Sequence, residues 1–537
     1  MISRRQLLAG GAAAFAAAPA IVRAQSLWRT YPFSLGVASG DPAPDGFVIW
    51  TRIAPEPLEP DGGVGVGIAE VKWEVASDDR FQTVVARGTA QARPELAHSV
   101  HVEVAGLQPD RPYWYRFELQ GERSPKGRAR TVPASGAPVA GLRFGVAGCQ
   151  HYEDGFYTAY GHLAREELAF VYHYGDYIYE YGGDQIRLTR NGDPIPPPVR
   201  RHQRRDLFDV TAYRQQYALY KMDADLQRAH AAHPFIVTMD DHEIANNWVG
   251  DIAEDPTPPE IFRLRKAAAL QAWYEHMPVR RRSFPQGSAI LTHRHARFGN
   301  LASIAFLDTR QYRSDQPCGD GFKPACAGVS APSATVLGAE QEAWLERNLQ
   351  QRGSAWNCFA QQVMMMSLDR RRGPQDGDTK QLNLDSWAGY EVPRQRMLAR
   401  MRGLDNVVVL TGDEHQNWAG LITDRDRPVG TEFVATSISS GGDGRDVRNG
   451  SDVILRNNPQ VKFMNDQRGY VTCDVTPERW LTNFMTLDRV TAPGAPVNKR
   501  ATFGIERGRA DLMLVEENAP PPRPSSPGTA PRPGGTQ

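Results

Sequence analysis

Length, composition and charge limit the classes of protein to which this chain can belong. It has 537 residues, of which 41% are hydrophobic and 23% charged, values ordinary for a globular protein with several domains and ample core. Lys plus Arg and Asp plus Glu each number 62, so the formal net charge is zero. This balance argues against a nucleic-acid binder that relies on bulk positive charge, and against an acidic disordered protein. We therefore expect no stable nucleic-acid binding.

Residues 1–25 have the pattern of an export signal. Arg4 and Arg5 precede an apolar, alanine-rich stretch over 9–20, and Ala24 ends a small-residue sequence suited to cleavage. The apolar stretch is too short and too rich in alanine for a good membrane span. The pattern resembles a twin-arginine signal, and a disordered N-terminus with a chance arginine pair is the alternative. The prediction is export by the twin-arginine machinery to the periplasm or beyond, with no transmembrane anchor after signal removal.

Residues 27–137 alternate short β-type runs with turn residues, which is typical of an antiparallel β-sandwich. The clearest runs are 47–51, 71–75, 101–104 and 113–119. The sequence from Leu107 to Tyr113 resembles the tyrosine corner of fibronectin-type and immunoglobulin-like domains. The segment offers no cluster of His, Cys or carboxylate residues, so we predict that it packs against or positions another domain.

The remaining chain divides into a large second domain and a short tail. Over 138–518, apolar strands are separated by long helical or loop segments, which is the pattern of an α/β layered domain. Residues 519–537 contain seven Pro and three Gly, so we expect disorder there. The predicted fold is α/β, with a β-sandwich at the N-terminus.

Polar side chains follow five apolar strands of the second domain. The polar residues in question are Cys149; Asp176 and Tyr179; Asp240, Asp241, His242, Glu243 and Asn247; Asp308 and Arg310; and Asp413 and His415. Open α/β sheets bind ligands outside the carboxyl ends of their strands, so we expect these groups to converge on one rim. Ordinary turn chemistry after strands is the alternative reading of each group taken alone.

The residue types at these strand ends suit metal ions. Three carboxylates, those of Asp176, Asp241 and Asp413, would repel one another too strongly to converge without cations between them. A thiol, a phenol and an imidazole extend the donor set: Cys149, Tyr179 and His415. A phenolate together with carboxylates favours Fe(III), and a thiolate can complete the coordination of that ion. The remaining oxygen ligands suit Ca²⁺, Mg²⁺ or Mn²⁺. Such a site can lower the pKa of a bound water and bind an anion, which phosphate-ester hydrolysis requires.

Four short blocks resemble the signature sequences of PhoD-type alkaline phosphatases. They are Gly148-Cys149, Gly175-Asp176-x-x-Tyr179, Asp240-Asp241-His242-Glu243 and Gly412-Asp413-x-His415. Further blocks at 36–42, 307–310, 385–390 and 437–442 extend the resemblance over about residues 30 to 515. The resemblance implies an N-terminal β-sandwich and a metallophosphatase core of two sheets flanked by helices. It also implies a cluster of Fe(III) with one or two Ca²⁺ ions, and release of phosphate outside the cytoplasmic membrane.

The more distant purple acid phosphatases share the Gly-Asp-x-x-Tyr block, and the comparison implies roles for the iron side of the site. Cys149 stands where those enzymes place an aspartate on iron. By the same resemblance Asp176 bridges the two metals, and Tyr179 is a ligand of iron.

The same comparison implies roles for the second metal. Asp241 matches an asparagine ligand, and His242 faces the phosphate or leaving group. Asp413 and His415 occupy the two positions of a Gly-His-x-His block, where His415 is either a ligand or a phosphate contact. A separate Val-x-x-His ligand has no counterpart, because residues 359–366 contain no histidine.

Several residues keep two interpretations. Asp240 either caps the following segment or supports His242. Asn247 either binds metal or phosphate, or caps a helix. Arg310 either holds a phosphate oxygen in a bidentate contact or forms a structural ion pair.

The five cysteines also divide by sequence context. Cys318 and Cys326 bracket a flexible loop and can close a local disulfide in an oxidising compartment, with two unpaired thiols as the alternative. Cys358 and Cys473 sit in apolar runs typical of buried thiols.

The function these observations favour is that of an exported metallophosphatase. It would hydrolyse phosphomonoesters, and phosphodiesters too, through metal-activated water, with His242, Arg310 and Asn247 acting on substrate. A hydrolase specialised for diesters, with phospholipase D-like or nuclease activity, is one alternative. An exported protein that only sequesters phosphate or iron is another.

Overall fold

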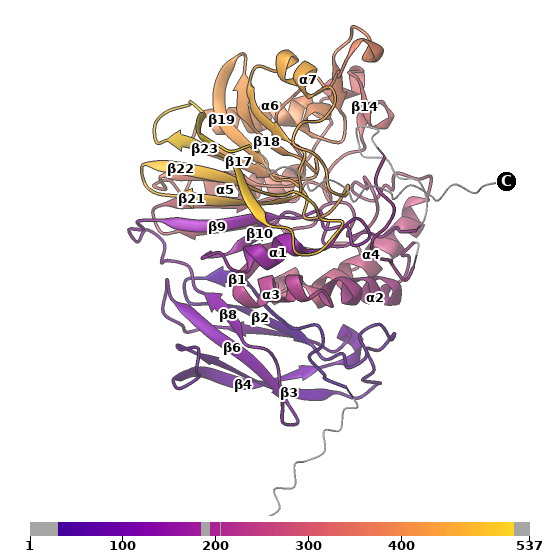
Figure 1. The fold of residues 1–537 in the computed structure, drawn as a ribbon, viewed down its shortest axis with the longest axis vertical. Helices are drawn as coiled ribbons and strands as arrows, with labels where there is room; N and C mark the ends of the chain where they lie inside the picture. The colour runs from indigo at the N-terminus through magenta and orange to yellow at the C-terminus, as the bar shows by residue number, and fades with distance from the viewer. Residues whose placement is uncertain (1–29, 184–193, 205, 520–537) are drawn as a thin grey trace, which may run out of the picture.

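The computed structural model describes residues 30–183, 194–204 and 206–519 (Figure 1). The predicted export signal, residues 1–25, lies outside the described residues, as does the predicted tail apart from Ala519. In the described part of the chain, no helix is both long and apolar enough to cross a membrane.

Within the described residues, the largest sheet has ten strands and combines strands from the N-terminal and C-terminal parts of the described chain. Its order is β24 (Met513–Glu517), β23 (Val497–Glu506), β22 (Arg479–Leu487), β21 (Gly469–Val475), β9 (Leu142–Ala147), β10 (Val171–His173), β11 (Pro234–Val237), β1 (Val37–Ala43), β2 (Gly46–Arg52) and β5 (Ser99–Val104). Its central strands β9, β10 and β11 are parallel to one another. Their carboxyl ends therefore lie along one edge.

The second sheet of the core has seven strands among the described residues. Its order is β12 (Arg294–Phe298), β13 (Ala302–Phe306), β15 (Trp356–Ala360), β17 (Val407–Thr411), β19 (Arg427–Val434), β18 (Asn417–Asp424) and β20 (Val461–Asn465). The run from β13 through β19 is parallel. A short ribbon of β14 (Phe322–Pro324) and β16 (Gln381–Asn383) lies apart from both large sheets.

The two large sheets pack face to face. Buried side chains of one sheet, such as Val146 and Ile236, share a core with Ile304, Cys358 and Leu410 of the other. Helices cover the outer faces, seen for α1 to α4 beside the larger sheet in Figure 1. The α-helices are α1 (Thr158–Leu163), α2 (Val210–Lys221), α3 (Ala224–Ala232), α4 (Pro259–His276), α5 (Gly338–Leu349), α6 (Glu391–Arg402) and α7 (Ser451–Asn457). The predicted α/β core of two sheets flanked by helices is confirmed.

Local sequence explains the starts of the helices nearest the site. Asp209 accepts a hydrogen bond from the Ala212 amide and begins α2, and Asp223 accepts from the Asp225 and Leu226 amides and begins α3. Such caps satisfy amides that the first turn of a helix leaves without a partner. The two helices then present buried side chains to β10 and β11.

The N-terminal segment forms a sandwich that shares a layer with the core. A sheet of β4 (Val84–Ala92), β3 (Ala69–Ala76), β6 (Pro112–Leu119), β7 (Glu122–Arg123) and β8 (Gly127–Arg130) packs on β1, β2 and β5. Tyr113 forms the expected corner, since its hydroxyl lies 3.0 Å from the Gln108 amide that donates to it. The sandwich continues directly into the larger core sheet, because β1 pairs in parallel with β11 at Ser39 and Pro234.

Candidate metal centre

Five residues singled out at strand ends share an uncommon backbone conformation. Their φ angles lie between 48° and 64°, in the left-handed region: Cys149, Asp176, Asn247, Asp413 and His415. Residues other than glycine occupy this region rarely, and such strain collects at functional sites where the surrounding structure imposes it. The loops after β9, β10, β11 and β17 therefore all turn sharply as they reach the same edge.

The ring of Tyr174 brings two of these loops together. A Cβ atom on either Gly148 or Gly412 would overlap this ring, so both glycines let backbone pack directly on it. The Tyr174 hydroxyl donates to the carbonyl of Thr436 at 3.0 Å, which holds the ring in place. Cys149 and Asp413, the residues after the two glycines, are thereby drawn to one site.

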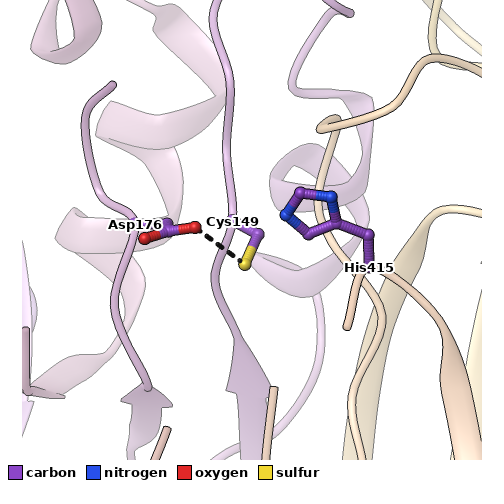
Figure 2. Close-up of side chains that lie close together, drawn as sticks. All are labelled: Cys149, Asp176 and His415. Atoms are coloured by element: carbon purple, nitrogen blue, oxygen red, sulfur yellow. Dashed lines mark hydrogen bonds between the residues drawn. The ribbon is translucent and has the colours of Figure 1, made fainter. Parts of the chain in front are cut away.

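One half of the site gathers sulfur, oxygen and nitrogen donors. Cys149 Sγ lies 3.3 Å from Asp176 Oδ2, and the Tyr179 hydroxyl donates to the same oxygen at 2.8 Å. The Tyr179 hydroxyl also lies 3.2 Å from His415 Nε2. Figure 2 shows Cys149, Asp176 and His415 reaching one space from three separate loops, and their ligand atoms lie within 4.8 Å of one another.

The other half of the site is built from carboxylates. Asp240, Asp241 and Asp413 offer oxygens within 4.8 Å of one another, and a second group within the same distance combines oxygens of Asp176 and Asp241 with a ring nitrogen of His242. Because Asp176 and Asp241 are shared between groups, the halves form one continuous cluster. The structure therefore brings together all six residues expected as metal ligands.

Burial makes this cluster electrostatically costly without a cation. Burial raises the pKa of the Cys149 thiol well above its usual value, and the nearby carboxylates of Asp176 and Asp413 raise it further. Burial and Asp176 likewise raise the pKa of Tyr179. Burial also raises the pKa of Asp176 well above its ordinary value, although His242 acts in the opposite direction. A bound cation would reverse all three shifts, since metals bind the deprotonated forms.

The donor set fits the metal ions that the sequence suggests. Thiolate, phenolate and carboxylate donors suit Fe(III), and the carboxylates around Asp241 suit a hard divalent ion. Two further oxygens, Asp240 Oδ2 and Asn247 Oδ1, are buried with no hydrogen-bond partner among the described residues. Buried polar atoms are rarely left in that state without a ligand, water or ion.

His242 lies beside the cluster, between the carboxylates of Glu180 and Asp241. Its Nδ1 lies 2.8 Å from Glu180 Oε2, and its ring stacks on that of Tyr179 with centroids 4.1 Å apart. Burial lowers the pKa of His242, but the carboxylates of Asp241 and Glu180 outweigh it, so that the pKa is raised well above its usual value. Nε2 lies 4.0 Å from Asp241 Oδ2, outside hydrogen-bond distance.

Arg310 is enclosed by carboxylates. Its Nε donates to Asp240 Oδ1 at 2.6 Å, and its Nη1 donates to Asp385 Oδ1 at 3.0 Å. Nη2 lies 3.7 Å from Asp241 and 3.8 Å from Asp413. The side chain is 1% exposed. Arg310 therefore forms buried ion pairs, while its Nη2 has no hydrogen-bond partner among the described residues, so both sequence interpretations of Arg310 stay open. The ion pair gives Asp240 a partner that neither interpretation of Asp240 named.

Comparison with known proteins places the chain in a family. A family described as PhoD-like phosphatase matches residues 144–484, and its N-terminal domain matches residues 16–133. Alkaline phosphatase D of Bacillus subtilis (strain 168) is 46% identical over 501 residues, which cover 92% of this chain and 84% of that protein. The chain belongs to the PhoD-like phosphatase family. As a member of this family it is a phosphoric ester hydrolase.

Solved structures extend the comparison to the fold. A structure of PhoD superposes with a TM-score of 0.87 at 45% identity, covering 92% of this chain and 94% of that one. The purple acid phosphatase PPD1 from yellow lupin seeds superposes with a TM-score of 0.51 at 11% identity, covering 88% of this chain and 73% of that one. The predicted resemblance to the PhoD family is confirmed, and the likeness to the lupin enzyme is one of fold.

Two polar supports of the PhoD-type site were not assigned from the sequence. Glu180 orients His242 and also accepts from the Asn246 amide at 2.7 Å. Ser440 Oγ lies 2.7 Å from both the Cys149 carbonyl oxygen and the Tyr179 hydroxyl oxygen, where its one proton can be donated to either. From the sequence, a role for Ser440 could be suspected only because it lies in the family-like block 437–442. A role for Glu180 could be suspected only because it follows Tyr179.

Two open alternatives are also resolved by the structure. No described helix begins at Asn247, since α4 starts at Pro259, so the helix-cap interpretation of Asn247 is wrong. Cys318 and Cys326 form a disulfide, whereas the buried Cys358 and Cys473 are free, as expected.

Proposed function

We propose that this PhoD-family member is an exported, metal-dependent alkaline phosphatase that hydrolyses phosphomonoesters and also phosphodiesters. The observation that carries the proposal is the convergence of thiol, phenol, imidazole and carboxyl groups in one buried cluster. The proposed ions are Fe(III) with one or two Ca²⁺, with Mg²⁺ or Mn²⁺ as alternatives at the second site.

The proposed ligands divide between the two halves of the cluster. Cys149 and Tyr179 would hold iron, and Asp176 would bridge the ions. The second ion would be held by Asp241 and Asp413, with Asn247 Oδ1 as a further oxygen donor, and His415 would add its Nε2 from the half that contains Cys149 and Tyr179. When bound, the ions supply positive charge that polarises a water molecule and offsets negative charge on the phosphoryl oxygens.

The protein's own residues would handle the substrate and its proton. Glu180 accepts from His242 Nδ1 and fixes the ring. In the charged form, which the carboxylates of Asp241 and Glu180 favour, Nε2 also carries a proton that can be given to a phosphate oxygen or leaving group. Arg310 would keep the carboxylates of Asp240 and Asp385 together and lower their mutual repulsion. Ser440 would hold the phenol of Tyr179 in register with Asp176.

Removal of metal tests the central part of the proposal. Treatment with a chelator is expected to lower hydrolysis of an aryl phosphate by about 100-fold or more, because Lewis-acid assistance is worth several kcal/mol. Adding back iron with Ca²⁺ should restore it. Hydrolysis that survives complete metal removal, checked by elemental analysis, would contradict the metal centre.

A comparison of substrates separates the remaining functional classes. Monoesters and diesters with the same aryl leaving group should both be hydrolysed, and a strong kinetic preference for diesters would indicate the specialised hydrolase instead. A metal-loaded protein that binds phosphate but turns over neither ester would be the binding protein.

The disulfide supports export of the protein. Disulfides persist in oxidising compartments and are rare in the cytosol, and Cys318 and Cys326 are joined here. Replacing Arg4 and Arg5 with lysine is expected to leave the protein in the cytoplasm, as measured by cell fractionation. Unchanged release from cells lacking a functional twin-arginine translocase would contradict this route.

A further inference from the structure

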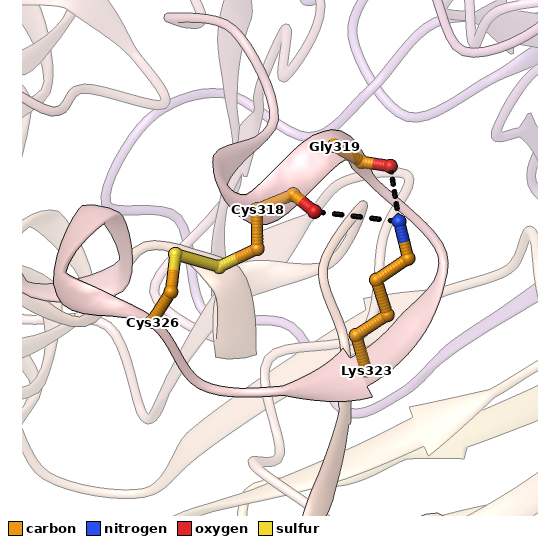
Figure 3. Close-up of a disulfide and its surroundings, with 4 residues drawn as sticks. All are labelled: Cys318, Gly319, Lys323 and Cys326. Carbon is orange, nitrogen blue, oxygen red and sulfur yellow. Dashed lines mark hydrogen bonds between the residues drawn. A yellow bond between two sulfur atoms is a disulfide. The ribbon is translucent and has the colours of Figure 1, made fainter.

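The loop closed by the disulfide between Cys318 and Cys326 lies beside the metal cluster. The bond between Cys318 and Cys326 closes a short loop, which Lys323 braces from inside by donating to the carbonyls of Cys318 at 3.3 Å and Gly319 at 2.7 Å (Figure 3). Strand β14 in this loop pairs with β16, which leads directly to Asp385. The loop is therefore held by its disulfide and by the hydrogen bonds of Lys323. It is also held by its pairing with β16, which leads to Asp385, a partner of Arg310.

One side chain of this loop contacts a proposed site residue. Asn247 Nδ2 donates to Asp320 Oδ2 at 2.7 Å. Asn247 is also held through its backbone, because its amide donates to Asp241 Oδ2 at 2.8 Å and its carbonyl accepts from Gln316 Nε2 at 2.7 Å. Asp320 is thus the partner of the Asn247 carboxamide, while Asp241 and Gln316 hold the backbone.

The chemistry of Asp320 decides which way the carboxamide of Asn247 faces. An ionised carboxylate only accepts hydrogen bonds, so the group turned toward Asp320 must be the NH₂ of Asn247. The oxygen Oδ1 is then turned away, and it is buried without a hydrogen-bond partner among the described residues. The backbone of Asn247 contacts Asp241, and a carboxamide oxygen is a ligand type that Ca²⁺ accepts.

The backbone of Asp320 points to a role for its side chain. At φ 59° and ψ 179°, Asp320 occupies a region that is essentially confined to glycine. Gly319 and Gly321, with φ of 70° and 81°, flank it, so the local chain already uses glycine where φ is positive. A glycine would fit position 320 with less strain than aspartate. The strain is compatible with a side chain retained for its contact with Asn247.

We propose that Asp320 is a positioning residue that fixes the carboxamide of Asn247 with its oxygen toward the metal cluster, and that the disulfide holds Asp320 in place. This inference rests on the proposed metal-dependent function and deepens it. Asp320 acts through Asn247 and supports the second metal. Partners of metal ligands typically change metal affinity by 10- to 100-fold when removed.

The replacement Asp320→Gly separates this role from a purely structural one. Full-length protein is freed of Ca²⁺ by dialysis and titrated with Ca²⁺ in a calorimeter. Asp320→Gly should weaken Ca²⁺ binding by about 10-fold or more, while the unfolding temperature of the Ca²⁺-free protein does not fall, because glycine relieves the backbone. Asp315→Ala is the matched control, since Asp315 is an exposed acid of the same segment, and among the described residues its side chain accepts from the adjacent Gln316 amide. It should leave Ca²⁺ binding unchanged.

Two further variants test the route through Asn247. In the Asn247→Ala background, Asp320→Gly should cause no additional loss of Ca²⁺ affinity, because the group it orients is gone. Asp320→Asn keeps an acceptor for Asn247 and should restore most of the affinity lost in Asp320→Gly. The paired change Cys318→Ser with Cys326→Ser should weaken Ca²⁺ binding in the wild-type background and not in Asn247→Ala.

The outcomes distinguish the two levels of the proposal. Wild-type protein that binds no Ca²⁺ would overturn the proposed Ca²⁺ site, and this inference with it. If wild-type protein and Asp320→Gly bind Ca²⁺ equally tightly, this inference alone is overturned. The same holds if Asp320→Gly lowers the Ca²⁺ affinity further in the Asn247→Ala background.

Discussion

Replacing Cys149 with alanine is expected to remove most of the bound iron and to lower turnover of an aryl phosphate by about 100-fold or more. The Cys149 thiol lies 3.3 Å from Asp176 Oδ2 and within the same donor group as His415, so alanine removes the sulfur ligand from the proposed iron site. Tyr179→Phe should remove the phenolate donor and, with it, the visible absorption of a phenolate-to-iron charge transfer. Iron per chain by elemental analysis and the visible spectrum are the two measurements.

The other buried thiols provide matched controls for Cys149. Cys358 lies in β15 and Cys473 in β21, both free and buried, and neither belongs to a candidate metal group among the described residues. Cys358→Ala and Cys473→Ala should cost about 1 kcal/mol of stability through small cavities and leave iron unchanged. If Cys149→Ala and Tyr179→Phe both keep the iron content and colour of the wild type, the proposed iron site is wrong.

The position of the candidate site was predictable because the information is local. The apolar runs before Cys149, Asp176, Asp241 and Asp413 end within a few residues of those side chains, and the structure ends β9, β10, β11 and β17 there. Parallel strands bring such ends to one edge, so strand recognition was enough to predict convergence. The sandwich was predictable for a similar reason, since β6 alternates half-buried and buried residues along its whole length.

What the sequence did not predict depends on pairings between distant segments. The parallel pairing of β1 with β11 joins residues almost 200 positions apart, and no local pattern specifies that partner. The contacts of Arg310 with Asp240 and Asp385 are of the same kind. Sequence reasoning could name Arg310 as an ion-pair or phosphate residue, but only the packed loops decide which carboxylates surround it.

The replacement Arg310→Met is expected to destabilise the metal-free protein by about 3–5 kcal/mol. Removing one partner of a buried ion pair leaves the other charge without compensation, and the guanidinium here bonds Asp240 and Asp385 while lying near Asp241 and Asp413. Denaturant unfolding of metal-free wild-type and variant protein measures the change. Bound cations should reduce the difference, because they offset the same carboxylates, so the loss in the metal-loaded protein is expected to be smaller.

An exposed arginine supplies the control and sharpens the choice between the two roles of Arg310. Arg456 on α7 pairs with Asp452, both side chains are about 70% exposed, and Arg456→Met should change stability by no more than about 0.5 kcal/mol.

A structural ion pair predicts a large loss of stability for Arg310→Met. A phosphate contact predicts a raised KM for aryl phosphate with stability near that of the wild type. The second result would reassign Arg310 to the substrate, and the carboxylates around it would then require a cation to stay together.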